Sequence, residues 1–261
     1  MSKTLILSDI HFCESKSSST SADRFRKLFD GINTLILNGD TTEEHSLCSF
    51  EASKKQTDEL LAIASEHDVQ TTMICGNHDP IISELDHVWL CDKSVLVFHG
   101  HAAFPEIAPW SWRSKYILKT RESYIRDNGD GFDEQLAAVR QASYEAASGT
   151  YKNQRPSLPH MCLLGMPAIF HVLSSWLKFP SLISDWVEKY APSANFIVTG
   201  HTHHAGIWKR KGRIIINTGC YGFPSHPRAV ILDDEAITVY RLKMSNGFYS
   251  LGRVCSSWNV R

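Results

Sequence analysis

The sequence lacks several features that would place it in a special class of protein. Its 261 residues carry a formal net charge of −1, so no global field favours nucleic acid or an anionic membrane. It contains seven cysteines, an odd number, and no Cys-x-x-Cys pair, which argues against a disulfide framework and a thiolate zinc site. We therefore expect reduced, mostly buried thiols and a cytoplasmic location.

Long apolar runs are absent as well. The chain begins Met-Ser-Lys and then enters a strand pattern, without the apolar run and cleavage site of a signal peptide. The longest apolar stretch, 161–173, is interrupted by Pro167 and His171 and is too short to span a bilayer. With 43% hydrophobic and 21% charged residues, the composition is typical of one globular domain, or of a domain with a lid.

The first third of the chain alternates between strand and helix patterns. Short runs rich in Leu, Ile and Thr predict strands over 4–8, 34–38 and 69–75. Apolar residues at helical spacing predict helices over 21–31 and 50–67. This alternation is typical of a parallel sheet with covering helices.

The middle of the chain has a different character. Two more strands are predicted over 87–91 and 94–98, and residues 102–195 then resemble several helices broken by prolines and glycines. The strand pattern returns at 196–199. The remainder predicts four strands, at 206–209, 213–217, 229–232 and 237–242. The outline is therefore strands in both halves with a helical insertion between them.

Candidate metal ligands directly follow five of the predicted strands. In chain order they are Asp9 and His11, Asp40, Asn77 with His78 and Asp79, His99 with His101, and His201 with His203 and His204. Because ligands of open α/β sheets bind at the carboxyl ends of strands, we expect these side chains to converge on one rim. Carboxylate and imidazole groups together suit divalent manganese, iron or zinc. One carboxylate can bridge two such ions about 3.5–4 Å apart, so a dinuclear site is predicted.

The same residues form five motifs in a fixed order. They are Asp9-Ile-His11, Gly39-Asp40-Thr-Thr-Glu43, Gly76-Asn77-His78-Asp79, His99 and Gly200-His201-Thr-His203. This set resembles the calcineurin-like metallophosphoesterases, whose pattern is D-x-H, G-D-x-x-D/E, G-N-H-D/E, H and G-H-x-H. The resemblance covers the sheet-forming parts of the chain. It implies an α/β fold, a four-layer α/β/β/α sandwich over residues 1–261, in which insertion 102–195 is a helical cap that moves as a lid.

The resemblance also implies a role for each motif residue. The first metal would be held by Asp9, His11, Asp40 and His203, and the second by Asp40, Asn77, His99 and His201, with Asp40 bridging. The cofactors would be two divalent ions, with manganese expected first and iron or zinc as alternatives, and a hydroxide bridging them would attack phosphorus in line. His78 would stabilise the transition state or protonate the leaving alkoxide. Glu43 would orient His78, unless the adjacent Glu44 substitutes.

Three further residues are candidate substrate contacts. His101 lies two residues beyond His99, where it either supports the ligands from behind or touches substrate. Cys220 stands where a segment resembling the family's N-T/P-G-S carries serine. Arg113 begins a basic run, 113–126, which is either a phosphate-facing strip or an ordinary solvated helix face.

Aromatic residues are dense in the insertion. They include Trp110, Trp112, Tyr116, Trp176, Phe179 and Trp186. They form either the lid's own small core or an apolar groove for an acyl chain or a nucleobase.

The function implied by the resemblance is hydrolysis of a phosphoester or phosphoanhydride in a small molecule or nucleotide, with no nucleic-acid partner. A cap at this position is similar to that of the UDP-2,3-diacylglucosamine pyrophosphatases, and His99-Gly100 resembles their H-G-D segment. However, His101 and His78 stand where those enzymes have aspartate and arginine. A lipid-nucleotide pyrophosphatase, with peripheral membrane contact through the cap, is therefore the first alternative.

Two other classes of function are less well supported. A protein serine/threonine phosphatase would carry the arginine of G-D-x-x-D-R-G, which Thr42-Glu43-Glu44 lacks. A non-catalytic scaffold tends to lose ligands or the catalytic histidine, whereas all the ligand positions and His78 are present here.

Overall fold

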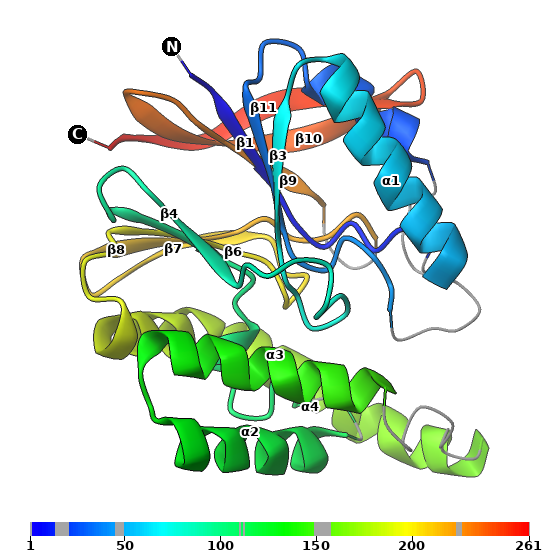
Figure 1. Cartoon of the computed structure of the whole chain (residues 1–261), viewed down its shortest axis with the longest axis vertical. Coiled ribbons are helices and arrows are strands. Elements are labelled where there is room, and N and C mark those ends of the chain that lie inside the picture. Colours follow the sequence, from blue (N-terminus) through cyan, green and yellow to red (C-terminus); the bar gives the residue numbers. More distant parts are fainter. Residues whose placement is uncertain are drawn as a thin grey trace.

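The computed structural model describes residues 2–13, 21–44, 50–109, 111, 113–148, 158–222 and 226–260. Two β-sheets lie face to face, and helices cover the outer side of each (Figure 1). This arrangement confirms the four-layer α/β/β/α fold expected from the sequence.

The first sheet has six strands in the order β11-β10-β9-β1-β2-β3. Its strands are β1 (Thr4–Leu7), β2 (Thr34–Asn38), β3 (Gln70–Ile74), β9 (Arg228–Leu232), β10 (Ala236–Ser245) and β11 (Phe248–Asn259). Strands β1, β2 and β3 are parallel, with Leu5 opposite Leu35 and Leu35 opposite Thr71. Strand β9 runs antiparallel to β1, and the hairpin β10–β11 extends the sheet beyond it.

The second sheet has five strands in the order β4-β5-β6-β8-β7. Its strands are β4 (His87–Leu90), β5 (Val95–Phe98), β6 (Phe196–Thr199), β7 (Gly206–Arg210) and β8 (Arg213–Asn217). Strands β5, β6 and β8 are parallel, so their carboxyl ends share one edge. The parallel strands of the second sheet therefore direct the residues that follow them to one edge, as the parallel strands of the first sheet do.

The helices fall into two outer layers. They are η1 (Ala22–Leu28), α1 (Phe50–Glu66), η2 (His101–Ala103), α2 (Ser114–Asn128), α3 (Phe132–Ser148) and α4 (Leu158–Tyr190). The 3₁₀ helix η1 and α1 cover the first sheet, whereas α2, α3 and α4 lie on the opposite side of the molecule (Figure 1).

Three apolar layers hold these elements together. In β1, Leu5 and Leu7 pack outward against η1 and α1, whereas Ile6 points inward between the sheets. Because both faces of the strand are covered, it is a continuous apolar run rather than an alternating one. On the far side, Phe98 and Ile197 pack outward under α2, α3 and α4.

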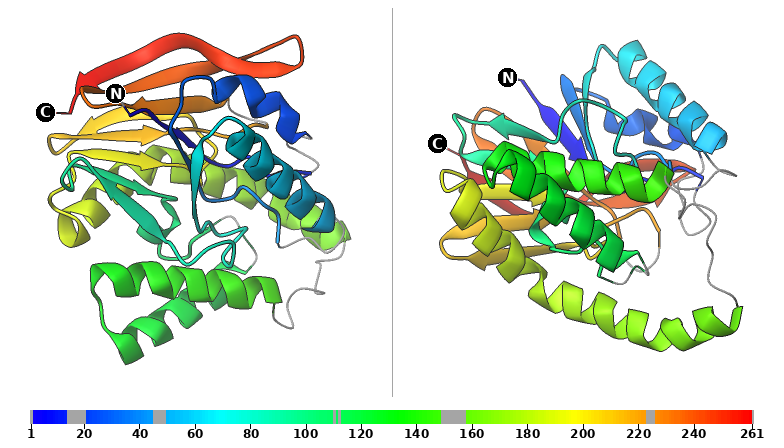
Figure 2. Two further views of the ribbon diagram at one scale, coloured as in Figure 1. Left: turned by 45° about the horizontal axis from the view of Figure 1, so that its top comes forward. Right: turned by 60° about the horizontal axis from the view of Figure 1, so that its bottom comes forward.

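The predicted insertion contains α2, α3 and α4, and part of it belongs to the sandwich itself. Phe179, Ile183 and Val187 of α4 pack in the same buried cluster as the outer face of the second sheet. The ring of Trp186 stacks on Phe98 with the centroids 5.0 Å apart. The C-terminal half of this 33-residue helix is therefore an outer layer of the sandwich, while the helix as a whole lies across the bottom of the molecule in the right view of Figure 2.

This packing decides between the two interpretations of some aromatic residues. Phe179 and Trp186 are core residues, shared between the helices and the second sheet. Trp110 and Trp112 lie outside the described residues. The prediction that the segment moves as a lid over the rim stays a prediction.

Two elements differ from the sequence expectation. The predicted helix 21–31 is the shorter 3₁₀ helix η1, and the Ser21 side chain makes no capping bond there. Its Phe25 and Leu28 are buried three residues apart, which suits the threefold period of a 3₁₀ helix. Strand β11 has no counterpart among the predicted strands. Its apolar and polar residues do not alternate clearly, and its burial pattern is correspondingly mixed.

Two expected absences concern the part of the chain that the structure describes. No disulfide joins any of the cysteines that it places, and none of its helices combines the length and the apolar character needed to cross a bilayer.

Candidate metal centre

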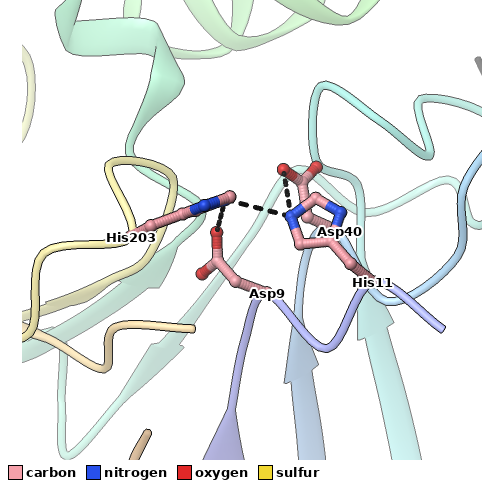
Figure 3. A group of neighbouring side chains, drawn as sticks. All are labelled: Asp9, His11, Asp40 and His203. Carbon is pink, nitrogen blue, oxygen red and sulfur yellow. Dashed lines mark hydrogen bonds and ion pairs between the residues drawn. The ribbon is translucent and has the colours of Figure 1, made fainter. Parts of the chain in front are cut away.

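Side chains from three strand ends point toward one another at the rim (Figure 3). Asp9 and His11 follow β1, Asp40 follows β2, and His203 follows β6. One donor atom from each of these four residues lies within 4.8 Å of all the others. The structure therefore brings together the four residues expected to hold a first metal.

The contacts within this group converge on a small volume. His11 Nε2 lies 3.0 Å from His203 Nε2 and 3.6 Å from Asp40 Oδ2, and His203 Nε2 lies 3.5 Å from Asp9 Oδ1. Asp9, His11 and Asp40 are fully buried. Two buried carboxylates facing two imidazole nitrogens are surroundings that suit a cation, because buried charge is costly unless it is paired.

A second group lies on the other side of Asp40. His99 Nε2 is 3.2 Å from Asp40 Oδ2, and His201 Nδ1 is 2.7 Å from Asn77 Oδ1. The His99 and His201 rings are 5.4 Å apart. Asp40 contacts members of both groups, which is the position that a bridging carboxylate needs.

Backbone carbonyls set the orientation of two of these rings. His99 Nδ1 donates to the Asn38 carbonyl at 2.9 Å, and His201 Nε2 donates to the Ile107 carbonyl at 2.7 Å. Because a carbonyl only accepts, the neutral rings carry their lone pairs on His99 Nε2 and His201 Nδ1. Histidines that bind metals are commonly held in this way. His201 Nδ1 then faces the side-chain amide of Asn77, 2.7 Å from its Oδ1.

Electrostatics at the two rings point the same way. Burial disfavours the cationic form of His99, but the Asp40 carboxylate more than offsets this and raises its pKa to about 9. At His201, burial and the neighbouring His99 lower the pKa to about 3. Burial also raises the pKa of Asp9 to about 6. The site therefore favours positive charge next to Asp40 and a neutral, ligand-competent imidazole at His201.

His78 and Glu43 form a pair at the edge of the site. His78 Nδ1 lies 2.8 Å from Glu43 Oε2, and the His78 side chain is 32% exposed. Although burial opposes its ionisation, His78 and His11 hold the pKa of Glu43 well below its ordinary value. The adjacent Glu44 accepts instead from the Ile81 amide, at 3.4 Å. The carboxylate of Glu43, rather than that of Glu44, therefore contacts the His78 ring.

Asp79 has a structural function that sequence reasoning missed. Its buried carboxylate accepts hydrogen bonds from four backbone amides, those of Gly76 at 2.9 Å, Asp40 at 2.8 Å, Thr41 at 2.7 Å and Thr42 at 3.1 Å. These bonds tie the loop after β3 to the loop after β2. The sequence feature that could have indicated this function is the acid that ends the G-N-H-D motif.

The backbone around the ligands is strained. Five non-glycine residues of the site have left-handed φ angles: Asp9 (52°), His11 (48°), Asp40 (54°), His201 (71°) and His203 (58°). Such conformations persist only where the surroundings over-determine them, and they cluster at functional sites.

Close approach explains the glycines of the motifs. Gly39 has a φ of 80°, and a Cβ there would lie 2.6 Å from His99 Nδ1. At Gly76 and Gly200 the φ is ordinary, but a Cβ would collide with the carboxylates of Asp40 and Asp9. These positions need glycine because the ligands occupy the space of a side chain.

The remaining sequence candidates lie around this centre. His101 is buried behind His99, with the rings 5.3 Å apart, and neither of its ring nitrogens has a hydrogen-bond partner among the described residues. This placement favours support from behind over substrate contact. Cys220 is buried, with its Sγ 3.3 Å from the Gly222 carbonyl.

The basic run 113–126 matches neither interpretation as a whole. Arg113 donates to the Ala146 carbonyl and so links the start of α2 to the end of α3, and its contact with substrate stays a prediction. Arg121 is buried and donates to backbone carbonyls, so it belongs neither to a phosphate-facing strip nor to a solvated face.

Helix α4 contacts the rim through Trp176. Trp176 Nε1 donates to the Thr202 carbonyl at 2.9 Å, and the Trp176 ring stacks on His204 at 4.7 Å. The helix thus contacts the loop that carries His201 and His203.

A sequence model of calcineurin-like phosphoesterases matches residues 2–205, which include all five motifs. The chain belongs to the calcineurin-like phosphoesterase family. The resemblance drawn from the motifs is thereby confirmed. No match to a curated protein is found.

Solved structures with the calcineurin-like phosphoesterase fold resemble the chain at low identity. Vps29 from Chaetomium thermophilum is 10% identical, with a TM-score of 0.50 over 99% of this chain and 95% of that chain. A dimetal phosphatase from Danio rerio is 13% identical, with a TM-score of 0.47 over 91% and 95% of the two chains. Zinc-bound Vps29 from Entamoeba histolytica is 11% identical, with a TM-score of 0.46 over 99% of each chain. At 10% identity, the likeness to Vps29 from Chaetomium thermophilum supports the fold alone.

Proposed function

We propose that this calcineurin-like phosphoesterase hydrolyses a phosphoester or phosphoanhydride bond in a small-molecule or nucleotide substrate. The observation that carries the proposal is the position of Asp40 between two groups of ligands. Asp40 Oδ2 lies 3.6 Å from Nε2 of His11, which is grouped with Asp9 and His203, and 3.2 Å from Nε2 of His99. The His99 ring in turn lies 5.4 Å from that of His201, which contacts Asn77. The family membership supports the same chemistry.

The residues present fit two divalent ions. The first would be held by Asp9, His11, Asp40 and His203, and the second by Asp40, Asn77, His99 and His201. The His99 and His201 nitrogens that would bind metal are the ones left by the bonds to the Asn38 and Ile107 carbonyls. Manganese is the first expectation, with iron or zinc as alternatives, because mixed imidazole, carboxylate and amide ligands suit all three. When bound, such ions activate water and neutralise charge on phosphoryl oxygens.

The protein's own residues supply the proton. Glu43 accepts from His78 Nδ1, which fixes the ring and directs Nε2 to a substrate oxygen. His78 is a third exposed, so a substrate at the rim can reach it. In this position His78 would hold the proton that the leaving oxygen needs.

One comparison tests the proposal directly. Hydrolysis of p-nitrophenyl phosphate and bis-p-nitrophenyl phosphate would be measured side by side, with added Mn²⁺ and with chelator. We expect Mn²⁺-dependent turnover that chelator abolishes, and the preferred compound would distinguish a monoesterase from a diesterase. Two bound ions without turnover of any phosphate ester, nucleotides included, would favour the non-catalytic scaffold.

A second candidate substrate carries an acyl chain, as in the UDP-diacylglucosamine type. Phe170, Leu173 and Leu177 lie exposed on α4 at the spacing of one helix face, and Leu177 is 84% exposed. Their neighbour Trp176 contacts the ligand loop at Thr202. An apolar face so close to the rim favours a lipid-linked nucleotide, with the cap resting on a membrane surface. Faster hydrolysis of an acylated UDP-sugar than of the same sugar without acyl chains would support it, and equal rates would exclude it.

A further inference from the structure

Arg121 of α2 is a buried arginine whose hydrogen bonds go to backbone carbonyls and one amide. Only 8% of it is exposed. Nη1 donates to the carbonyls of Phe104 at 2.6 Å and Pro105 at 3.3 Å, and Nη2 donates to the Ala102 carbonyl at 2.8 Å and to Gln135 Oε1 at 2.6 Å. No carboxylate lies within ion-pair distance of it in the described part of the chain.

A buried guanidinium without a carboxylate partner is costly. Burial lowers the pKa of Arg121 below its ordinary value, because it disfavours the charged form of the guanidinium. Its rigid fork binds three carbonyls at once, and a lysine cannot reproduce that geometry. The carbonyls belong to the end of η2 and the turn beyond it, where backbone acceptors lack helical partners.

The turn that Arg121 holds leads directly to the metal centre. The Phe104 carbonyl accepts from Arg121 and also from the Ile107 amide, at 3.1 Å. Ile107 in turn presents its carbonyl to His201 Nε2 at 2.7 Å. It has a φ of 60°, which is rare for a β-branched residue, so this carbonyl points at the ring only because its surroundings hold it there.

We propose that Arg121 is a positioning residue for the second metal. By holding the turn 102–107, it keeps the Ile107 carbonyl on His201 Nε2 and the Nδ1 lone pair directed toward Asn77. The inference rests on the proposed function, because that function assigns His201 and Asn77 to a metal. Arg121 touches neither the substrate nor the ions.

The test is a Mn²⁺ titration of the full chain, with bound metal counted by mass spectrometry after equilibrium dialysis and with thermal unfolding followed in parallel. The variants are Arg121→Met, Arg121→Lys and, as a matched control, Arg126→Met, since Arg126 is exposed on the same helix. We expect Arg121→Met to weaken the second Mn²⁺ on the order of 10- to 100-fold, as loss of outer-shell partners does. The first Mn²⁺ should bind as in the wild type, Arg121→Lys should fall between, and Arg126→Met should match the wild type.

Two outcomes would overturn the inference. Arg121→Met could bind both ions as tightly as the wild type, or it could lose both equally together with its melting temperature, which is what a purely structural residue would do. If Arg121→Met does not fold, Arg121→Lys decides by the same criterion. Failure of the proposed function is separately visible in the wild type, which would then bind fewer than two Mn²⁺ ions or would bind two without turnover of any phosphate ester.

Discussion

At the residue scale, Glu43 and Glu44 look equivalent in the sequence, but the structure distinguishes them. His78 Nδ1 lies 2.8 Å from Glu43 Oε2. Glu43 is buried and lies between His78 and His11, whereas the Glu44 carboxylate accepts from a loop amide. Because the two histidines keep Glu43 ionised, it can hold the ring of His78 in one orientation. Two substitutions test this arrangement.

Replacing His78 with alanine should leave metal binding intact and lower turnover on the order of 10²-fold or more, because the proton donor would be lost. Steady-state kinetics and a metal count would be measured on the same preparation. His171→Ala is the control, since His171 is exposed on α4, and it should match the wild type. Full activity in His78→Ala would contradict the role.

Replacing Glu43 with glutamine should also lower turnover, by about 10-fold or more, because His78 would lose the partner that orients it. Glu44→Gln is the matched control and should remain close to wild-type activity. Equal losses in both variants would show that the contact with Glu43 does not matter. The measurement is kcat at saturating Mn²⁺.

At the element scale, helix α4 is buried along one part and exposed along another. Its C-terminal half is a layer of the sandwich, where Ile183 is fully buried against the second sheet. Six residues earlier, about 1.7 turns of the helix, Leu177 lies almost fully exposed on the face that includes Phe170 and Leu173. Similar side chains on the same helix should therefore differ in their contribution to stability.

The pair Ile183→Ala and Leu177→Ala tests this difference. Ile183→Ala should lower the free energy of unfolding by about 2–5 kcal/mol, because it removes buried methyl groups and leaves a cavity. Leu177→Ala should change it by less than about 0.5 kcal/mol, as surface substitutions do. Denaturant unfolding would measure both. Similar losses would mean that something covers Leu177.

At the scale of the whole molecule, the metal centre joins the two sheets. Asp9 and Asp40 come from the first sheet, and His99, His201 and His203 from the second. The Asp9 carboxylate also accepts from the His201 amide at 2.9 Å, so the sheets are linked at the rim even without cations. Metal bound there would tie the two halves together.

Metal removal should therefore destabilise the entire fold. Added Mn²⁺ at about 100 times its dissociation constant should stabilise the protein by about 2.7 kcal/mol per site, and chelator should remove this gain. Calorimetric melting with Mn²⁺ and with chelator would show it.

In Asp40→Asn the bridging carboxylate is lost, so both the Mn²⁺ count and the Mn²⁺-dependent stabilisation should fall. An unchanged metal count would contradict the bridging role.

The sequence patterns predicted the parallel strands with covering helices and the set of candidate ligands, and the resemblance carried by the motifs implied the four-layer sandwich. Strand runs such as 4–8 and 34–38 are local patterns, and a polar residue that directly follows a parallel strand must lie at its carboxyl edge. Asp9, Asp40, Asn77, His99 and His201 could therefore be named, and the motifs revealed the family, without any coordinates.

The roles that depend on contacts across the chain became visible only in the three-dimensional packing. The choice of Glu43 over Glu44, the four amides on Asp79, the stacking of His204 on Trp176 and the burial of Arg121 all join residues far apart in the sequence. No local pattern carries them, because a carboxylate or a guanidinium looks the same in a sequence whether it meets water, a metal or a backbone carbonyl. Those partners are set by the packing of the two sheets and their helices.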